Sequence, residues 1–332
     1  MNFETISQFV VSATVVVIAA RWLAYASDEM AKVTGLSHLF IGSLFLAAST
    51  SAPELFVDIR ATLDNLPNLA SGDLLGSSLM NLMIFSVLAF LYRATEKPIE
   101  SPGIRLSSLL AALLTAEVGV LIFWKPSWRF LGLGIGSFLI LGTYLFGTRL
   151  IFKKALKATS EGTSPSRSTR KIFKPMLRFF LAALVLFFAS PMLVGSMERI
   201  SLHTGLGNTF LGASLLAFTT SLPELISSIT AARMGLFDLF IGNIVGSNAI
   251  NMLIFVFMDW IWSKPPLWDH LAEKNLLICA VVVLNMLTLA FTWKASGKSR
   301  PLRTRLGTAF ILLLSMGCYA ALFLLKSSHH GR

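Results

Sequence analysis

Long apolar runs separated by short polar segments make up nearly the whole chain. Each run is roughly 20 residues long, enough to cross the ~30 Å hydrocarbon layer as a helix. The polar breaks place the expected spans at 6–25, 38–62, 73–92, 106–124, 130–152, 176–195, 208–232, 239–262, 274–293 and 306–325. The pattern predicts an all-α integral membrane protein with about ten transmembrane helices.

Composition and charge agree with this interpretation. The chain is 55% hydrophobic and 14% charged, and its net charge of +11 is carried in loops rather than on one soluble face. We therefore expect the lipid bilayer to be the partner of the apolar surface, and we expect the protein not to bind nucleic acid. The most basic loop lies between the fifth and sixth spans and contains Arg149, Lys153, Lys154, Lys157, Arg167, Arg170, Lys171, Lys174 and Arg178. Basic loops stay in the cytoplasm, so we expect a multi-pass protein of the cell (inner) membrane with both termini non-cytoplasmic.

The same loop divides the chain near its middle. Residues 153–175 are rich in Ser, Thr and basic residues and are expected to be a flexible cytoplasmic linker. The expected halves are residues 1–152 and 176–332, with five spans each. Because five is odd, the second half enters the membrane in the opposite sense, which predicts two inverted five-helix repeats.

An internal repeat supports this division. A shift of 170 positions aligns the two halves without a gap. Identical matches include Thr34-Gly35-Leu36 with Thr204-Gly205-Leu206, Gly42 with Gly212, Leu46-Ala47 with Leu216-Ala217, Thr50-Ser51 with Thr220-Ser221, Pro53-Glu54-Leu55 with Pro223-Glu224-Leu225, Gly72 with Gly242, Gly76-Ser77 with Gly246-Ser247, and Asn81 with Asn251. Inverted repeats of this kind are typical of secondary transporters with midplane sites.

The repeat carries the candidate chemistry. Glu54 and Glu224 lie inside apolar spans, where an ionised side chain costs at least ~2.5–3.5 kcal/mol. Each follows a proline, which interrupts helical hydrogen bonding and frees backbone carbonyls. The surrounding side chains are oxygen donors, and Ca²⁺ and Na⁺ prefer oxygen ligands. The donors are Thr50, Ser51, Ser77 and Asn81 in the first copy and Thr220, Ser221, Ser247 and Asn251 in the second.

These motifs resemble the signature of the cation/Ca²⁺ exchanger superfamily, whose repeats carry Ser-x-Pro-Glu and Gly-Asn-x-x-Gly-Ser-Asn elements. The compact prokaryotic sodium/calcium exchangers are the most similar in size. The resemblance implies a Ca²⁺ site formed by Glu54, Glu224, Thr50, Thr220 and the backbone carbonyls of Ala47 and Ala217. It also implies Na⁺ sites at Ser51, Ser77, Ser221 and Ser247, with Asn81 and Asn251 near the centre. No cofactor is expected, because Ca²⁺ and Na⁺ are substrates.

Three departures from the family pattern affect the coupling ion. The first copy has Asp73 and Ser78 where the second has Asn243 and Asn248. Many sodium-coupled members place Asp where Asn251 stands, so exchange against H⁺ or K⁺ stays an alternative to Na⁺. Asp58 has only Ser228 opposite; of a vestibule charge and an interfacial charge, we expect the latter.

Two other functions are weaker interpretations. A cation channel usually repeats a pore element about the membrane normal, which an inverted repeat does not do. An intramembrane enzyme would need a nucleophile with a base or a Cys/His metal site at membrane depth, and the sequence suggests neither, so we expect no enzyme. Glu117 stands outside both motifs and is expected to serve helix packing or snorkelling. The oligomeric state stays open, with a monomer as the working expectation.

The expected mechanism is alternating access. The first and sixth spans, at 6–25 and 176–194, would slide past a rigid core and expose Glu54 and Glu224 to each side in turn.

Overall fold

The structure is a computed structural model that describes residues 3–92, 94, 103–160, 169–204, 217–262, 264, 266–293 and 300–328. The prediction of an all-α fold is confirmed. In the first half the elements are α1 (Phe3–Thr34), α2 (His38–Ile41), the π-helix η1 (Gly42–Leu46), α3 (Ala47–Thr50), α4 (Ala52–Leu63), α5 (Pro67–Leu91), α6 (Gly103–Trp124), the strands β1 (Arg129–Phe130) and β2 (Leu133–Gly134), and α7 (Ile135–Ser160).

The second half repeats this order of helices. Its elements are α8 (Thr169–His203), α10 (Leu222–Arg233), α11 (Phe237–Ile261), the 3₁₀-helix η3 (Leu267–His270), α12 (Asn275–Thr292) and α13 (Arg300–Ser328). The bounds of α10 and α11 equal those of α4 and α5 shifted by 170 positions. The alignment of the sequence therefore also holds for the ends of these helices.

Eight helices of the described part are long and apolar enough to span a membrane, and one bent helix pair brings the total to nine. The bent pair joins His38–Thr50 to Ala52–Leu63 at 44°. The span expected at 208–232 falls partly outside the described residues, as do the repeat positions Gly205, Gly212 and Leu216.

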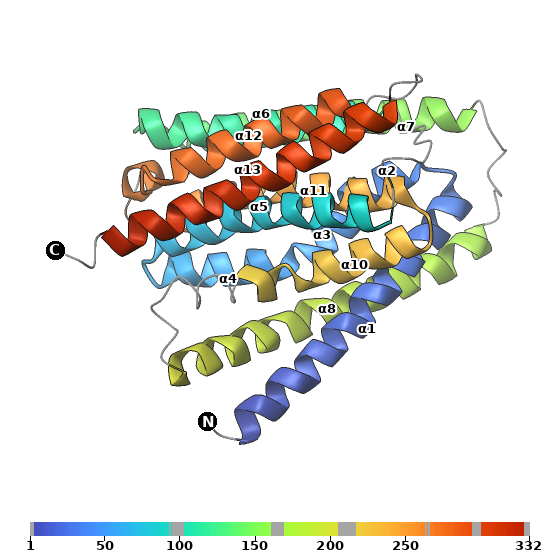
Figure 1. The fold of residues 1–332 in the computed structure, drawn as a ribbon, viewed down its shortest axis with the longest axis horizontal. Helices are drawn as coiled ribbons and strands as arrows, with labels where there is room; N and C mark the ends of the chain where they lie inside the picture. The colour runs from blue at the N-terminus through green and yellow to red at the C-terminus, as the bar shows by residue number, and fades with distance from the viewer. Residues whose placement is uncertain are drawn as a thin grey trace.

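Two long helices form a separate pair on one side of the molecule. Figure 1 shows α1 and α8 side by side along the lower edge, with α6, α7 and α12 toward the upper edge and α4, α5, α10 and α11 between them, while α13 runs obliquely from the upper right to the left. Helix α1 packs on α10, and α8 packs on α4. The first turn of α1 and the last turn of α13 lie at the same end of the bundle (Figure 1), as expected for termini on one side of a membrane.

The helices extend further than the apolar runs indicate. Helix α1 has 32 residues and α8 has 35, because their polar ends continue the helix beyond the hydrocarbon layer. Helices α7 and α8 also occupy both ends of the expected linker, up to Ser160 and from Thr169. The start of the fifth expected span is a short hairpin, in which Arg129 pairs with Gly134.

Candidate cation-binding site

The two glutamates lie where a helix breaks and restarts. Ser51 and Ser221 precede α4 and α10 and share nearly the same backbone conformation, with φ −85° and ψ 8° against φ −80° and ψ 6°. Each proline lies in the first turn of the new helix, where its missing N–H is tolerated. Glu54 and Glu224 therefore lie at helix N-termini, whose positive dipole ends favour a carboxylate.

Glu54 is fully buried and is linked to the second half through Ser77. Its Oε1 atom accepts a hydrogen bond of 3.0 Å from Ser77 Oγ on α5. Ser77 Oγ in turn lies 3.0 Å from Ser221 Oγ, which belongs to the second repeat. Glu54 Oε2 has no hydrogen-bond donor among the described residues.

Glu224 is also fully buried and has two donors to the same oxygen. Ser51 Oγ, from the first repeat, donates to Glu224 Oε1 over 3.2 Å, and Ser247 Oγ donates over 3.4 Å. Within the described part of the chain, Glu224 Oε2 is without a donor. Each carboxylate thus presents one buried oxygen that could ligate a cation.

The threonines and alanines of the predicted Ca²⁺ site lie together at each helix break. Thr50 Oγ1 is 3.3 Å from the Ala47 carbonyl oxygen, and Thr220 Oγ1 is 2.9 Å from the Ala217 carbonyl oxygen. The amides of Ser51 and Ser221 bond to the same carbonyls. A cation bound by these carbonyls would therefore compete with the threonine hydroxyls.

The asparagines link the repeats reciprocally. Asn81 Nδ2 donates to Asn248 Oδ1 over 3.0 Å, and Asn251 Nδ2 donates to Ser78 Oγ over 3.3 Å. These two contacts are equivalent under the shift of 170 positions. The Oδ1 atoms of Asn81 and Asn251 are buried without donors among the described residues, so both remain open to a cation.

A backbone crossing brings the two motifs close. A Cβ atom on Gly42 would lie 2.6 Å from the Leu239 carbonyl oxygen, and one on Gly246 would lie 2.5 Å from Ser43 Cα. Only glycine permits this contact between η1 and α11. The π-helical turn at Gly42–Leu46 immediately precedes the predicted ligand Ala47, as π-bulges often do at functional sites.

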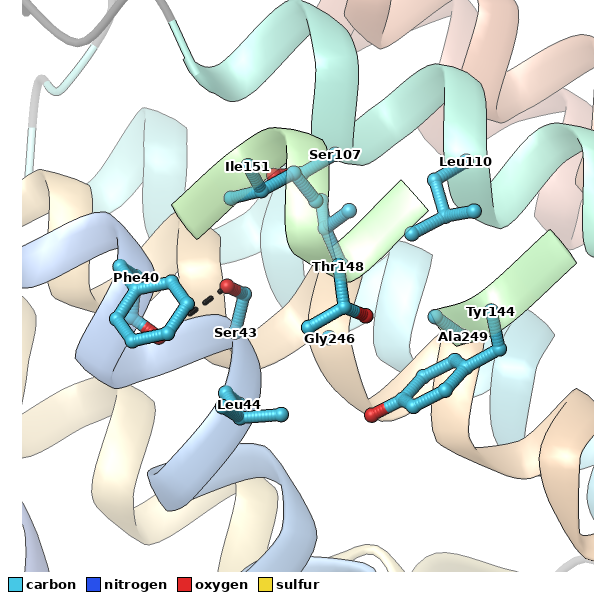
Figure 2. A pocket seen from close by; sticks show the side chains of 11 residues that line it. Phe40, Ser43, Leu44, Ser107, Leu110, Tyr144, Thr148, Ile151, Gly246 and Ala249 are labelled. Carbon is cyan, nitrogen blue, oxygen red and sulfur yellow. Dashed lines mark hydrogen bonds between the residues drawn. The ribbon is translucent and has the colours of Figure 1, made fainter. Parts of the chain in front are cut away.

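A small cavity lies beside this turn. Figure 2 shows Ser43, Tyr144 and Thr148 around it, together with Gly246. Its volume is about 20 Å³, which fits roughly one water molecule. Neither glutamate lines it, so it is separate from the candidate cation site.

Two acidic residues outside the predicted site have different surroundings. The expectation that Asp58 lies at the interface is wrong, because its exposed fraction is 0%. Helix α4 is enclosed by α5, α8 and α11, which hides this turn. Glu117 Oε1 accepts a hydrogen bond of 2.7 Å from Thr143 Oγ1, in keeping with the expected packing role.

The predicted set of site residues omitted part of the network. Asn243 Oδ1 lies 3.2 Å from Thr50 Oγ1, and Asn243 Nδ2 donates to the hydroxyls of Ser227 and Ser228. Asn248 bridges to the first repeat through the Ser78 carbonyl at 3.0 Å. Both asparagines belong to the Gly-Asn-x-x-Gly-Ser-Asn element, and their place in this element was the feature of the sequence that could have identified them as site residues.

Comparison with known proteins identifies the family. The sodium/calcium exchanger protein family matches residues 5–150 and 174–325. The chain belongs to this family. The two matched segments are separated at the expected linker, and membership in an exchanger family confirms the predictions of a cation exchanger and of a transporter rather than an enzyme.

Individual relatives agree with this assignment. The chain is 28% identical over 253 residues to the inner membrane protein YrbG of Escherichia coli, covering 74% of this chain and 76% of YrbG. It is 29% identical over 245 residues to the putative antiporter CaxA of Alkalimonas amylolytica, covering 71% and 73%.

A solved structure confirms the fold. The sodium-calcium exchanger NCX_Mj, soaked with 10 mM Na⁺ and zero Ca²⁺, matches with a TM-score of 0.73 and 19% identity over 97% of this chain and 100% of that chain.

Proposed function

We propose that this exchanger moves Ca²⁺ in one direction and Na⁺ in the other through a site formed by Glu54 and Glu224. The observation that carries the proposal is that both glutamates are fully buried, one from each repeat, and that neither Oε2 atom has a donor among the described residues. Two carboxylates supply the charge that balances one Ca²⁺. The names of the similar exchanger NCX_Mj and the putative antiporter CaxA support the same activity.

The proposed ligands surround these carboxylates. For Ca²⁺ they are Glu54, Glu224, Thr50, Thr220 and the carbonyls of Ala47 and Ala217; for Na⁺ they are Ser51, Ser77, Ser221 and Ser247, with Asn81 and Asn251 between them. Ca²⁺ takes six to eight oxygen ligands, and this set supplies enough. Because both ions need the same carboxylate region, binding of one excludes the other, and exchange follows from this competition.

Alternating access is the proposed mechanism. Helices α1 and α8 form a pair that contacts the core through α10 and α4, the two helices that begin beside the glutamates. Sliding of this pair along α4 and α10 would open the site to one side and close it to the other. We place the two halves at residues 1–152 and 176–332 with a cytoplasmic linker between them, and both termini on the opposite side of the inner membrane.

The test is ⁴⁵Ca²⁺ uptake into proteoliposomes of the purified protein, driven in turn by outward gradients of Na⁺, K⁺ and H⁺. We expect uptake under the Na⁺ gradient and loss of at least tenfold in Glu54→Gln and Glu224→Gln, because each removes one ligand charge. Uptake under only the K⁺ or the H⁺ gradient would show that this ion, and not Na⁺, is the coupling ion.

Glu117→Gln is the matched control, because Glu117 is an intramembrane glutamate that bonds Thr143 and lies outside the repeat motifs. It should keep most of the uptake. Absence of Ca²⁺ uptake under all three gradients would refute the Ca²⁺ assignment.

A further inference from the structure

The two repeats differ at one pair of positions next to the candidate site. In the second repeat, Asn243 Nδ2 donates to Ser228 Oγ over 3.1 Å. The equivalent positions of the first repeat are Asp73 and Asp58. Two acidic side chains therefore replace both members of a hydrogen-bonded amide–hydroxyl pair, and neither can donate to the other when both are ionised.

Asp58 is buried with no donor for its charge. Its exposed fraction is 0%, and its Oδ1 and Oδ2 atoms both lack a partner among the described residues. Asp73 Oδ2 likewise has none in the described chain. An unpaired buried carboxylate costs several kcal/mol even after relaxation of its surroundings. Asp58 in particular thus needs a proton or a cation that the described side chains do not provide.

Asp259 shows how the same fold satisfies a structural buried carboxylate. It is also 0% exposed, but Gly134 N and Ser137 Oγ each donate to it over 2.7 Å, and Arg129 Nη1 lies 3.5 Å away. Asp58 differs from Asp259 because, among the described residues, both of its buried carboxylate oxygens lack a donor, as does Oε2 of Glu54 on the same helix.

The pair is continuous with the cation site. Asp58 lies one helical turn after Glu54 on α4, and Asp73 lies one turn before Ser77 on the packed helix α5. The titratable groups around the pair are Glu54 on α4, Glu224 on α10 and Tyr319 on α13, whose hydroxyl donates to the Gly76 carbonyl over 3.0 Å. Each of these groups is acidic, and so none of them neutralises the pair.

We propose that Asp58 and Asp73 bind one further cation beside Glu54, held chiefly by carboxylate oxygens. Among the described residues, no three Asp, Glu, His or Cys side chains are gathered closely enough to hold a metal ion. The two carboxylates offer at most four oxygens, fewer than the six to eight ligands that Ca²⁺ takes, so we assign the pair a proton or Na⁺ rather than a second Ca²⁺. This inference rests on the proposed function only in taking Glu54 as part of a cation site. With Asp58 and Asp73, the first repeat has two more acidic residues at these positions than the second.

The test compares the wild-type chain with the double variant Asp58→Ser/Asp73→Asn. This variant installs the residues of the second repeat, whose hydrogen bond shows that the pair is compatible with this helix geometry. Equilibrium ⁴⁵Ca²⁺ binding to the purified full-length chain is measured against pH in Na⁺-free buffer and against Na⁺ at fixed alkaline pH. Because Ca²⁺ at Glu54 repels a neighbouring cation, we expect the number of cations displaced per Ca²⁺ to fall by about one in the variant.

A smaller number of protons displaced per Ca²⁺ in the pH series would identify the ligand as a proton, and a smaller number of Na⁺ ions displaced in the Na⁺ series would identify it as Na⁺. Unchanged displacement in both arms would overturn the proposal.

A second measurement does not depend on Ca²⁺ binding. In a Glu54→Gln/Glu224→Gln background, added Na⁺ or acid should still raise the midpoint of thermal unfolding, because a ligand bound only by the folded protein stabilises it. Asp58→Ser/Asp73→Asn in that background should remove this rise. A rise of the same size in both proteins would refute the second site even if the wild-type chain failed to bind ⁴⁵Ca²⁺.

Discussion

At the scale of single residues, the two glutamates are held unequally. Among the described residues, Glu54 accepts its side-chain hydrogen bond from Ser77, whereas Glu224 accepts from Ser51 and Ser247. Removing the donor of a buried acceptor costs about 1–3 kcal/mol, and more when the acceptor is charged. Equivalent substitutions in the two repeats should therefore have different consequences.

We expect Ser77→Ala to lower the free energy of unfolding in cation-free buffer by about 1–3 kcal/mol, since Glu54 loses its donor and Ser221 loses its contact with Ser77. Ser247→Ala should lower it less, because Glu224 keeps Ser51. Denaturant unfolding of both variants, with and without Ca²⁺, measures the difference. Equal losses in the two variants would contradict the unequal support of the glutamates.

The sequence indicated these residues but not their contacts. Glu54, Glu224 and their hydroxyl neighbours stand out because charged residues in apolar runs are costly and the pattern occurs twice. The crossed hydrogen bond from Ser51 to Glu224 was not predictable, since a repeat does not say which copy a side chain faces. The burial of Asp58 was missed for a similar reason: exposure near a span end is decided by packing of α4 against other helices.

At the scale of elements, the crossing of η1 and α11 determines the separation of the repeats. The backbone of Ser43 lies against Gly246 with no space for a side chain. The repeat marked Gly246 through its match with Gly76, whereas the π-helical turn at Gly42–Leu46 has no comparable signal in the spacing of apolar residues.

Gly246→Ala should force η1 away from α11, because the new Cβ would overlap the Ser43 backbone. Overpacking of this kind costs about 1–3 kcal/mol or more, and we expect a lower unfolding midpoint together with loss of ⁴⁵Ca²⁺ uptake. Gly142→Ala on α7 is the matched control, since nothing lies within 4 Å of its added Cβ. Wild-type uptake by Gly246→Ala would show that this crossing tolerates expansion.

At the scale of the whole molecule, α1 and α8 are tied together near both ends. Arg178 Nη1 donates to the Glu29 carboxylate at 2.7 and 2.8 Å, and Arg199 Nη2 donates to Gln8 Oε1 at 2.6 Å. Helix α1 is joined to the core differently, through His38 at the start of α2, whose Nε2 lies 2.8 Å from Asp28 Oδ1. If α1 and α8 move as one body, a cross-link between these two helices and a cross-link between α1 and the core should affect transport differently.

We expect a cross-link between Gln8→Cys and Arg199→Cys to preserve ⁴⁵Ca²⁺ exchange, because it joins two helices that move together. A cross-link between Asp28→Cys and His38→Cys should block exchange, because it fixes α1 to the core. Both would be made with a bifunctional thiol reagent after replacing the two native cysteines, Cys279 and Cys318. The opposite result would refute sliding of the pair as a unit.

The architecture was the most predictable level. The apolar runs indicated the helices because span-length hydrophobicity is a local property, and the match at a shift of 170 positions indicated their duplication. The true lengths of α1 and α8 were underestimated, since the expected spans followed the apolar runs, whereas polar residues beyond them, such as Glu29 of α1 and Arg199 of α8, also belong to the helices.

The reciprocal asparagine contacts have a consequence for how such a chain could arise. Asn81 donates to Asn248, and its equivalent Asn251 donates to Ser78, which is the equivalent of Asn248. Each half therefore carries both sides of the interface, as in an isologous homodimer. A five-helix ancestor that inserted into the membrane in both orientations would pair with itself through these amides. Fusion into one chain releases the halves from identity, and Asp58 with Asp73, opposite Ser228 and Asn243, is a pair of positions at which the halves now differ.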